Sequence, residues 1–184
     1  MLPYILILFA IAMRFVTPYT HGAFLWNYSA VGAALLFFGS RVEKKNLWIP
    51  VALFTATDFA LNVFVYHYPV TTFQYGSLLY YAIAVGLGLL LVNKPSALRI
   101  LGITLAGSTA FFIISNFMVW MGGGMYPLDF NGLVQCYTAA IPFARGTYVG
   151  DLVYVALFFG TPVLLSITRQ DPVEVRVSRD SQSR

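Results

Sequence analysis

Charged side chains are scarce in this chain of 184 residues, where Asp, Glu, Lys and Arg together make up only 10%. A soluble domain carries roughly 25% charged residues, so this composition excludes an ordinary water-exposed surface. Hydrophobic residues account for 59% of the chain, and its mean hydropathy is +0.74. The sequence therefore predicts an integral membrane protein embedded in a lipid bilayer, and its length suits one domain.

Cysteine and catalytic motifs are also lacking. The single cysteine, Cys136, excludes a disulfide within the chain. No CxxC, HExxH, P-loop or GxSxG pattern occurs, so we expect neither enzyme activity nor a bound cofactor. The net charge of +4 comes mainly from basic residues in short connections and in the tail. That distribution does not indicate nucleic-acid binding.

Long apolar stretches are what the sequence does contain. A membrane-spanning helix needs roughly 20 apolar residues, and the stretches that reach or approach this length are 3–16, 29–42, 47–66, 77–92, 97–121 and 148–167. The first two are the shortest, so they either extend into flanking residues or lie partly inside the bundle. We predict an all-α membrane protein with about six transmembrane helices, the alternative being five helices and a re-entrant element. Residues 1–167 form its one domain, and residues 168–184 form a polar tail whose composition predicts disorder.

Basic residues sort to one side of the predicted membrane. The connections after the second and fourth spans, together with the tail, contain Arg41, Lys44, Lys45, Lys94, Arg99, Arg169, Arg176, Arg179 and Arg184. The opposite side contains only Arg14 and Arg145. Because positively charged loops stay in the cytoplasm, the sequence predicts a multi-pass protein of the plasma (inner) membrane with both termini cytoplasmic.

The predicted outer connections are long and rich in Tyr, Phe and Trp. Two interpretations stay open: these aromatic residues line a concave ligand site, or they form an ordinary interfacial belt. The candidate ligand-binding residues are His21, Trp26, Asn27, His67, Tyr75, Trp120, Asn131, Gln135 and Tyr137, with Asp58 and Asn116 deeper in the membrane. Histidine and thiol ligands suit transition metals, so His21, His67 and Cys136 are the metal candidates, although they lack local ligand spacing.

The connection between the fifth and sixth predicted spans contains the sequence GGGMYPLDFNGLVQCYTAAIPFARG, residues 122–146. Apolar residues from Phe130 to Ile141 recur at helical spacing. Asp129 is placed to cap this helix, and Pro142 is expected to end it. A helix lying flat on lipid headgroups usually carries many Lys and Arg residues, which are lacking here. We therefore predict an amphipathic lid helix that packs over a ligand site.

Ionisable residues within the predicted spans are few. Because a charge in the membrane core is costly, each is expected to have a partner or to face a cavity. Arg14 and Asp151 are predicted at similar depth near the outer side, so we expect a structural ion pair between the first and last helices. Asp58 lies near the middle of the third span, where no basic residue is predicted. It either bonds to other helices or handles a ligand or a proton.

Small residues at four-residue spacing let membrane helices approach closely. Ala30 and Ala34 form one such pair, and Gly146 and Gly150 form a second. These faces pack either inside the molecule or against a partner protein.

Two stretches carry a resemblance to known proteins: NYSAVGAALLFFGSRVEKKNLWIPVALFTATDFALNVF and SNFMVWMGGGMYPLDFNGLVQCYTAAIPFARGTYVGDLVY. They resemble an uncharacterised family of small bacterial integral membrane proteins. That family in turn resembles the substrate-binding (S) subunits of energy-coupling-factor (ECF) transporters. The resemblance implies six helices, a solute cavity capped by outer loops, and a coupling subunit and ATPases as partners. S subunits carry an Ala-xxx-Ala pattern on the first helix, whereas the nearest match here, Ala30 and Ala34, falls on the second.

These observations lead to two functional hypotheses. In the first, the protein is a membrane subunit that binds a small vitamin-like or trace-nutrient solute for uptake, as an S subunit does. In the second, it is a structural or assembly subunit of a larger membrane complex with no transport role. A binding subunit requires a hollow beneath the outer connections, whereas a scaffold requires a filled core.

Overall fold

The computed structural model describes residues 1–17, 29–67, 72–92 and 96–168. Within these ranges every regular element is helical, which confirms the predicted all-α class. The elements are α1 (Leu2–Val16), α2 (Val31–Arg41), the 3-10 turn η2 (Lys44–Asn46), α3 (Trp48–Leu61), the π-helical turn η3 (Asn62–Tyr66), α4 (Thr72–Leu89), α5 (Ala97–Met121) and α6 (Phe130–Thr168). The predicted tail lies outside the described residues except for Thr168, the last residue of α6.

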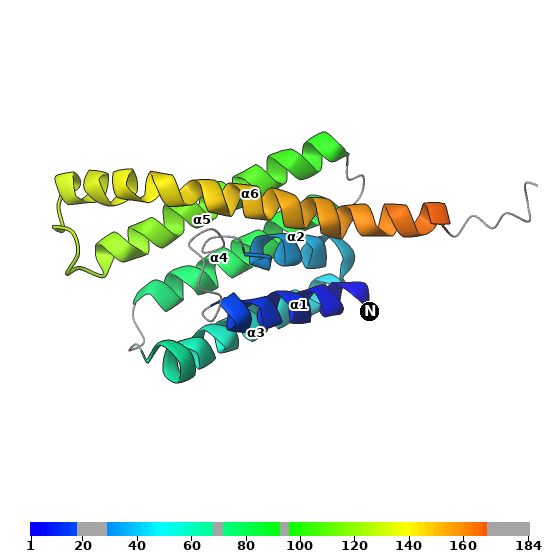
Figure 1. Cartoon of the computed structure of the whole chain (residues 1–184), viewed down its shortest axis with the longest axis horizontal. Coiled ribbons are helices and arrows are strands. Elements are labelled where there is room, and N and C mark those ends of the chain that lie inside the picture. The colour runs from blue at the N-terminus through cyan, green and yellow to red at the C-terminus, as the bar shows by residue number, and fades with distance from the viewer. Residues whose placement is uncertain (18–28, 68–71, 93–95, 169–184) are drawn as a thin grey trace, which may run out of the picture.

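The helices run along a common direction and alternate between two ends of the bundle (Figure 1). One end, the basic end, holds the N-terminus, the ends of α2, α4 and α6 and the start of α5. Arg41, Lys44, Lys45 and Arg99 belong to the parts of α2, η2 and α5 at this end. The other end, the hairpin end, holds the end of α3, the start of α4 and the connection between α5 and α6, residues 122–129.

The short helix α2 forms the core of the bundle. All of residues 31–40 are buried, and α2 packs against α1, α4, α5 and α6. Its 11 residues are about 17 Å long, which is shorter than the roughly 30 Å hydrocarbon layer of a membrane. The stretch predicted at 29–42 therefore lies inside the bundle, which was one of its two predicted arrangements.

Glycines on α2 and α4 allow these two helices to cross closely. A Cβ atom added to Gly88 would lie 2.5 Å from the carbonyl oxygen of Leu36 and 2.9 Å from the Cα of Gly39. A Cβ added to Gly39 would overlap the carbonyl oxygen of Val85. No real Cβ is accommodated at such distances, so only glycine fits at this crossing.

The predicted small-residue faces also lie inside the molecule. Ala30 and Ala34 are buried at the start of α2, and Gly150 is buried on α6, while Gly146 is half-buried. These faces were predicted to pack either inside the molecule or against a partner protein. Ala30 and Ala34 pack inside the molecule.

Apolar side chains cover much of the outer surface of the bundle. Two described helical segments, Lys44–Tyr66 and Ala97–Met121, are long and apolar enough to cross a membrane. Large exposed hydrophobic residues occur on α1, α3, α4, α5 and α6 and include Ile5, Leu8, Phe59, Leu79, Leu98, Leu101, Leu105, Ile113, Val153 and Leu157. Soluble monomers rarely expose contiguous apolar patches of more than a few hundred Å².

Helix α6 differs from its prediction. It is one helix of 39 residues, about 58 Å long, and not a lid helix followed by a separate sixth span. Its first half runs alongside α5 (Figure 1), so the predicted lid over the bundle is wrong. The predicted cap is confirmed, because Asp129 Oδ1 accepts a hydrogen bond of 2.7 Å from the backbone N–H of Gly132.

Contacts with α5 account for the continuity of α6 through Pro142. The Tyr137 hydroxyl donates to the carbonyl oxygen of Ile113 at 2.7 Å, and the Cys136 thiol donates to that of Asn116 at 3.4 Å. An interior proline costs roughly 3 kcal/mol of helix stability. After the proline, the Tyr148 hydroxyl is 2.8 Å from the Thr109 hydroxyl of α5, so α6 is bonded to α5 on both sides of Pro142.

The crossing of α2 and α4 gives a direct test of the core. Replacing Gly39 by Ala should lower the free energy of unfolding by about 1–3 kcal/mol, because the added methyl group overlaps the α4 backbone. Thermal unfolding in detergent measures this loss. Gly86→Ala is the matched control on α4, since a Cβ there meets nothing within 4 Å and should leave stability unchanged or slightly raised. Equal effects of the two substitutions would contradict the close crossing.

Candidate functional site

A closed polar network joins three helices near the hairpin end. Arg14 of α1 forms an ion pair with Asp58 of α3 through Nη2 and Oδ1. Arg14 Nη1 also donates to the Tyr81 hydroxyl of α4 at 2.9 Å, and that hydroxyl donates to Asp58 Oδ2 at 2.9 Å. The Asp58 side chain is 9% exposed and that of Arg14 is 24% exposed. We call these three residues the Arg14 network.

This network corrects two predictions. Arg14 was expected to pair with Asp151, and Asp58 was expected to have no basic partner, yet Arg14 pairs with Asp58. The reason is that α1 packs directly against α3, so the long arginine side chain reaches the level of Asp58 from the last turn of its helix. The position of Arg14 in its predicted span gives the depth of its backbone in the membrane, but not the depth that its guanidinium reaches.

Asp151 has a different partner. It is buried on α6, and its Oδ2 atom accepts a hydrogen bond of 2.7 Å from the Ser108 hydroxyl of α5. A Cβ added to Gly32 of α2 would lie 2.5 Å from Asp151 Oδ1 and 2.8 Å from the Tyr80 hydroxyl. Asp151 therefore lies where α2, α4, α5 and α6 meet. In the part of the chain that the structure describes, no basic side chain forms an ion pair with Asp151.

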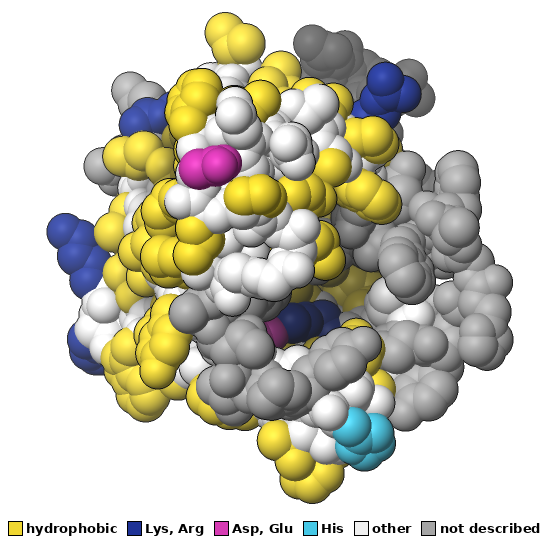
Figure 2. All heavy atoms as spheres, turned by 90° about the vertical axis from the view of Figure 1, so that its left-hand side faces the viewer, with side chains coloured by type: hydrophobic (Ala, Val, Ile, Leu, Met, Phe, Trp, Pro, Cys, Tyr) yellow, Lys and Arg dark blue, Asp and Glu magenta, His cyan; other side chains and the backbone are white. Residues whose placement is uncertain are grey.

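Two members of the Arg14 network, Arg14 and Tyr81, line one hollow together with Asp151, and we call this hollow the central cavity. Asp58 lies behind them and is not part of the lining. The volume of the cavity is about 350 Å³, and its lining consists of Arg14, Ser29, Val31, Gly32, Ser77, Tyr80, Tyr81, Phe111, Thr147 and Asp151. The hairpin end of the molecule is hollowed, with a basic and an acidic side chain at the bottom of the hollow (Figure 2). Arg14 and Asp151, which were predicted to pair, thus contribute to one cavity without bonding to each other.

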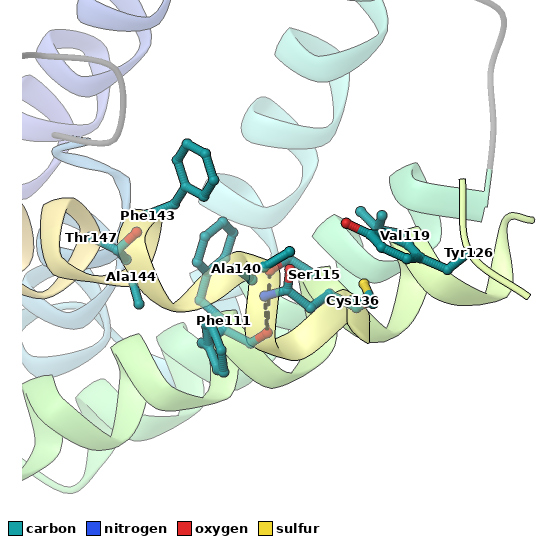
Figure 3. Close-up of a pocket in the computed structure, with 12 residues that line it drawn as sticks. Phe111, Ser115, Val119, Tyr126, Cys136, Ala140, Phe143, Ala144 and Thr147 are labelled. Atoms are coloured by element: carbon teal, nitrogen blue, oxygen red, sulfur yellow. Dashed lines mark hydrogen bonds between the residues drawn. The ribbon is translucent and has the colours of Figure 1, made fainter. Parts of the chain in front are cut away.

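A second hollow, the hairpin groove, lies between α5 and α6. Its volume is about 410 Å³, and it is largely apolar (Figure 3). Phe112, Asn116, Tyr126, Cys136, Ala140 and Phe143 are among its lining residues. Phe111 and Thr147 line both hollows, so the hairpin groove adjoins the central cavity.

The predicted ligand residues are only partly brought together. Asn116 lines the hairpin groove and donates to the carbonyl oxygen of Phe112 at 2.7 Å. Trp120 donates from Nε1 to the carbonyl oxygen of Pro127 at 2.8 Å, which ties α5 to the hairpin connection. Tyr75, Asn131 and Gln135 are exposed, and, like Trp120 and Tyr137, they line neither the central cavity nor the hairpin groove. His21, Trp26 and Asn27 lie outside the described residues.

Metal binding finds no support in the described ranges, where no three His, Cys, Asp or Glu side chains come together to hold an ion. Cys136 is buried in the hairpin and bonded to the α5 backbone. His67 ends η3 in the left-handed conformation, with φ of 54°, and is exposed. Because His21 lies outside the described residues, the three-residue metal site stays a prediction.

Of the residues that line the central cavity, sequence analysis named only Arg14 and Asp151. The residues that it missed include Gly32, Tyr80 and Tyr81 of the wall, and Ser108, which bonds to Asp151. The signal for the two tyrosines was a pair of polar-tipped aromatics in the middle of the apolar stretch 77–92. Buried tyrosine hydroxyls require partners, so such a pair indicates a polar group on a neighbouring helix. The partner of Tyr81 is the Arg14 network.

The fold and site define an all-α bundle with a polar, charge-lined cavity at one end. The chain matches the family described as "Family of unknown function (DUF6580)" over residues 1–173, and it belongs to that family. No curated protein and no solved structure matches the chain.

The Arg14 network gives a second prediction. Arg14→Met should cost about 3–5 kcal/mol of stability, because it leaves the Asp58 carboxylate buried without its partner. The double variant Arg14→Met with Asp58→Leu should recover most of this loss, since it removes both charges. Thermal unfolding of the set in detergent measures the coupling.

Lys45→Met provides the control for that series. Lys45 pairs with Glu43 at 2.7 Å, but both side chains are more than 70% exposed, and exposed pairs contribute only about 0–1 kcal/mol. A loss for Arg14→Met no larger than that for Lys45→Met would contradict a buried network.

Proposed function

We propose that this protein is a multi-pass protein of the plasma membrane that binds a small solute in the central cavity from the outer side. The observation that carries the proposal is the central cavity itself, in which charged and tyrosine side chains from three helices line one hollow of about 350 Å³. Ligand pockets commonly measure about 300–1,000 Å³ and combine apolar walls with a few convergent polar groups.

A membrane location is supported by the outer surface and by the charge distribution. The apolar side chains exposed on α1, α3, α5 and α6 suit contact with lipid tails. Arg41, Lys44, Lys45 and Arg99 gather at the basic end, which the positive-inside rule places in the cytoplasm. In this orientation the hairpin end and the opening of the central cavity face the outside.

Binding explains why the bundle holds ionisable groups at all. Charged side chains inside a membrane protein are costly and mark ligand or ion pathways. A purely structural bundle gains more from apolar packing than from a buried ion pair. Here Arg14 and Asp151 line the same hollow instead of bonding to each other, which favours a role in binding.

Uptake is the role that follows from such a site. The sequence has no nucleotide-binding motif, so energy for uptake would come from partners. The predicted likeness to ECF S subunits supplies the kind of partner, a membrane coupling subunit with ATPases. Under this proposal the chain delivers the solute and its partners drive the transport.

The alternative, a structural or assembly subunit, is favoured by one observation. The first half of α6 and the connection before it expose large apolar side chains, including Met125, Leu128, Phe130 and Phe143. Such a surface suits a protein partner as well as lipid. A scaffold role, however, does not explain why costly ionisable side chains line a cavity inside the bundle.

Co-purification tests the proposal. The protein isolated from its native membrane should carry one small molecule, detected by mass spectrometry of the denatured sample. Ser77→Trp should abolish this molecule because its side chain fills the central cavity. Tyr75→Trp is the matched control: it adds bulk at a residue that is 70% exposed and outside the cavity, so the molecule should remain.

Two results of this experiment would contradict the proposal. A fixed protein partner recovered in stoichiometric amount with no small molecule would favour the scaffold. A small molecule retained equally by both tryptophan variants would mean that it binds outside the central cavity.

A further inference from the structure

The charges around the central cavity do not balance. The positive charge of Arg14 is matched by Asp58 through their ion pair. Asp151 adds a carboxylate to the lining, and among the described residues no basic side chain other than Arg14 lines this cavity. The described wall therefore carries an excess of one carboxylate over its basic groups, which favours a positively charged occupant.

The geometry of Asp151 leaves one of its oxygens available. Oδ2 is held by the Ser108 hydroxyl. Within the described residues no hydrogen bond reaches Oδ1, which lies beside Gly32, near the Tyr80 hydroxyl. Gly32 lets the α2 backbone lie close to Oδ1 and the hydroxyl, since a Cβ there would overlap both atoms. Gly32, Tyr80 and Asp151 all line the central cavity, so a donor group inside the cavity can bond to Oδ1 and to the hydroxyl oxygen.

The rest of the wall suits the remainder of an organic cation. The rings of Tyr80 and Phe111 pack in a T-shaped pair with centroids 5.0 Å apart, and Tyr80 packs against Tyr81 at 5.9 Å. Aromatic faces attract cations. Beyond Phe111 and Thr147 the cavity adjoins the apolar hairpin groove, which provides room for an apolar body.

We infer that the solute of this site is a small organic cation, a protonated amine with an apolar body, whose ammonium group binds Asp151 Oδ1. This inference rests on the proposed function, since it names the chemical class of the solute for the same cavity. Asp151 acts as its binding residue, and the Ser108 hydroxyl positions the carboxylate. Arg14 also lines the cavity, but its ion pair with Asp58 contributes no net charge.

The test uses probes of similar shape that differ in charge. Phenethylamine, phenethyl alcohol and hydrocinnamate are added separately to the full chain in detergent at neutral pH, and binding is followed by calorimetry and thermal shift. We expect the amine to bind at least about tenfold more tightly than the alcohol or the carboxylate. Butylamine, butanol and valerate repeat the comparison with a smaller apolar body.

Variants then test whether Asp151 is the residue that binds the amine. Asp151→Asn should weaken amine binding by at least about tenfold, since it removes the ionic partner and keeps the size of the side chain. Asp129→Asn is the matched control, because Asp129 caps α6 far along the hairpin and an asparagine caps equally well. It should leave amine binding unchanged. If Asp151→Asn does not fold, the comparison of probes on the unaltered chain still decides the charge preference.

Each outcome separates this inference from the proposed function. Equal or tighter binding of the alcohol or the carboxylate overturns the cationic solute but leaves a solute site in place. Amine binding that survives in Asp151→Asn overturns the role of Asp151. No binding by any probe of either size overturns the inference, and the co-purification experiment then decides separately whether the cavity binds another class of solute.

Discussion

The burial of charge in an apolar bundle is the constraint on which the rest of this structure depends. A single unpaired carboxylate inside such a bundle would cost several kcal/mol, roughly 3–5 when its partner is removed. The Arg14 network meets this constraint with one guanidinium, one carboxylate and one phenol, each from a different helix. It therefore fixes how α1, α3 and α4 are placed relative to one another, and it forms one wall of the central cavity.

The shortness of helix α2 accounts for a cavity next to such a tightly packed core. The helix is only 11 residues long and is buried over residues 31–40, whereas α5 and α6 have 25 and 39 residues. Longer helices packed around a shorter one leave space beyond its end unless side chains fill it. Gly32, in the first turn of α2, adds no side chain to that space. Asp151, Tyr80 and Tyr81 face it from the neighbouring helices.

Composition and periodicity were sufficient to predict the helical class, the bounds of α5 at residues 97–121 and the cap at Asp129. They did not predict the partner of Arg14, because neighbouring helices and the reach of an arginine are set by tertiary packing. The continuity of α6 was missed for a similar reason: contacts of Cys136 and Tyr137 with α5 override the local effect of Pro142. Tyr80 and Tyr81 were missed because a tyrosine in an apolar stretch resembles an ordinary packing residue.

The opening of the central cavity to the outside is the claim that one measurement tests most directly. Ser77→Cys places a thiol on the cavity wall, and Lys45→Cys places one at the basic end. A membrane-impermeant maleimide is added to sealed right-side-out vesicles in a Cys136→Ala background. We expect labelling of Ser77→Cys in sealed vesicles and none of Lys45→Cys until the vesicles are opened. Labelling of Lys45→Cys in sealed vesicles, or no labelling of Ser77→Cys after opening, would contradict it.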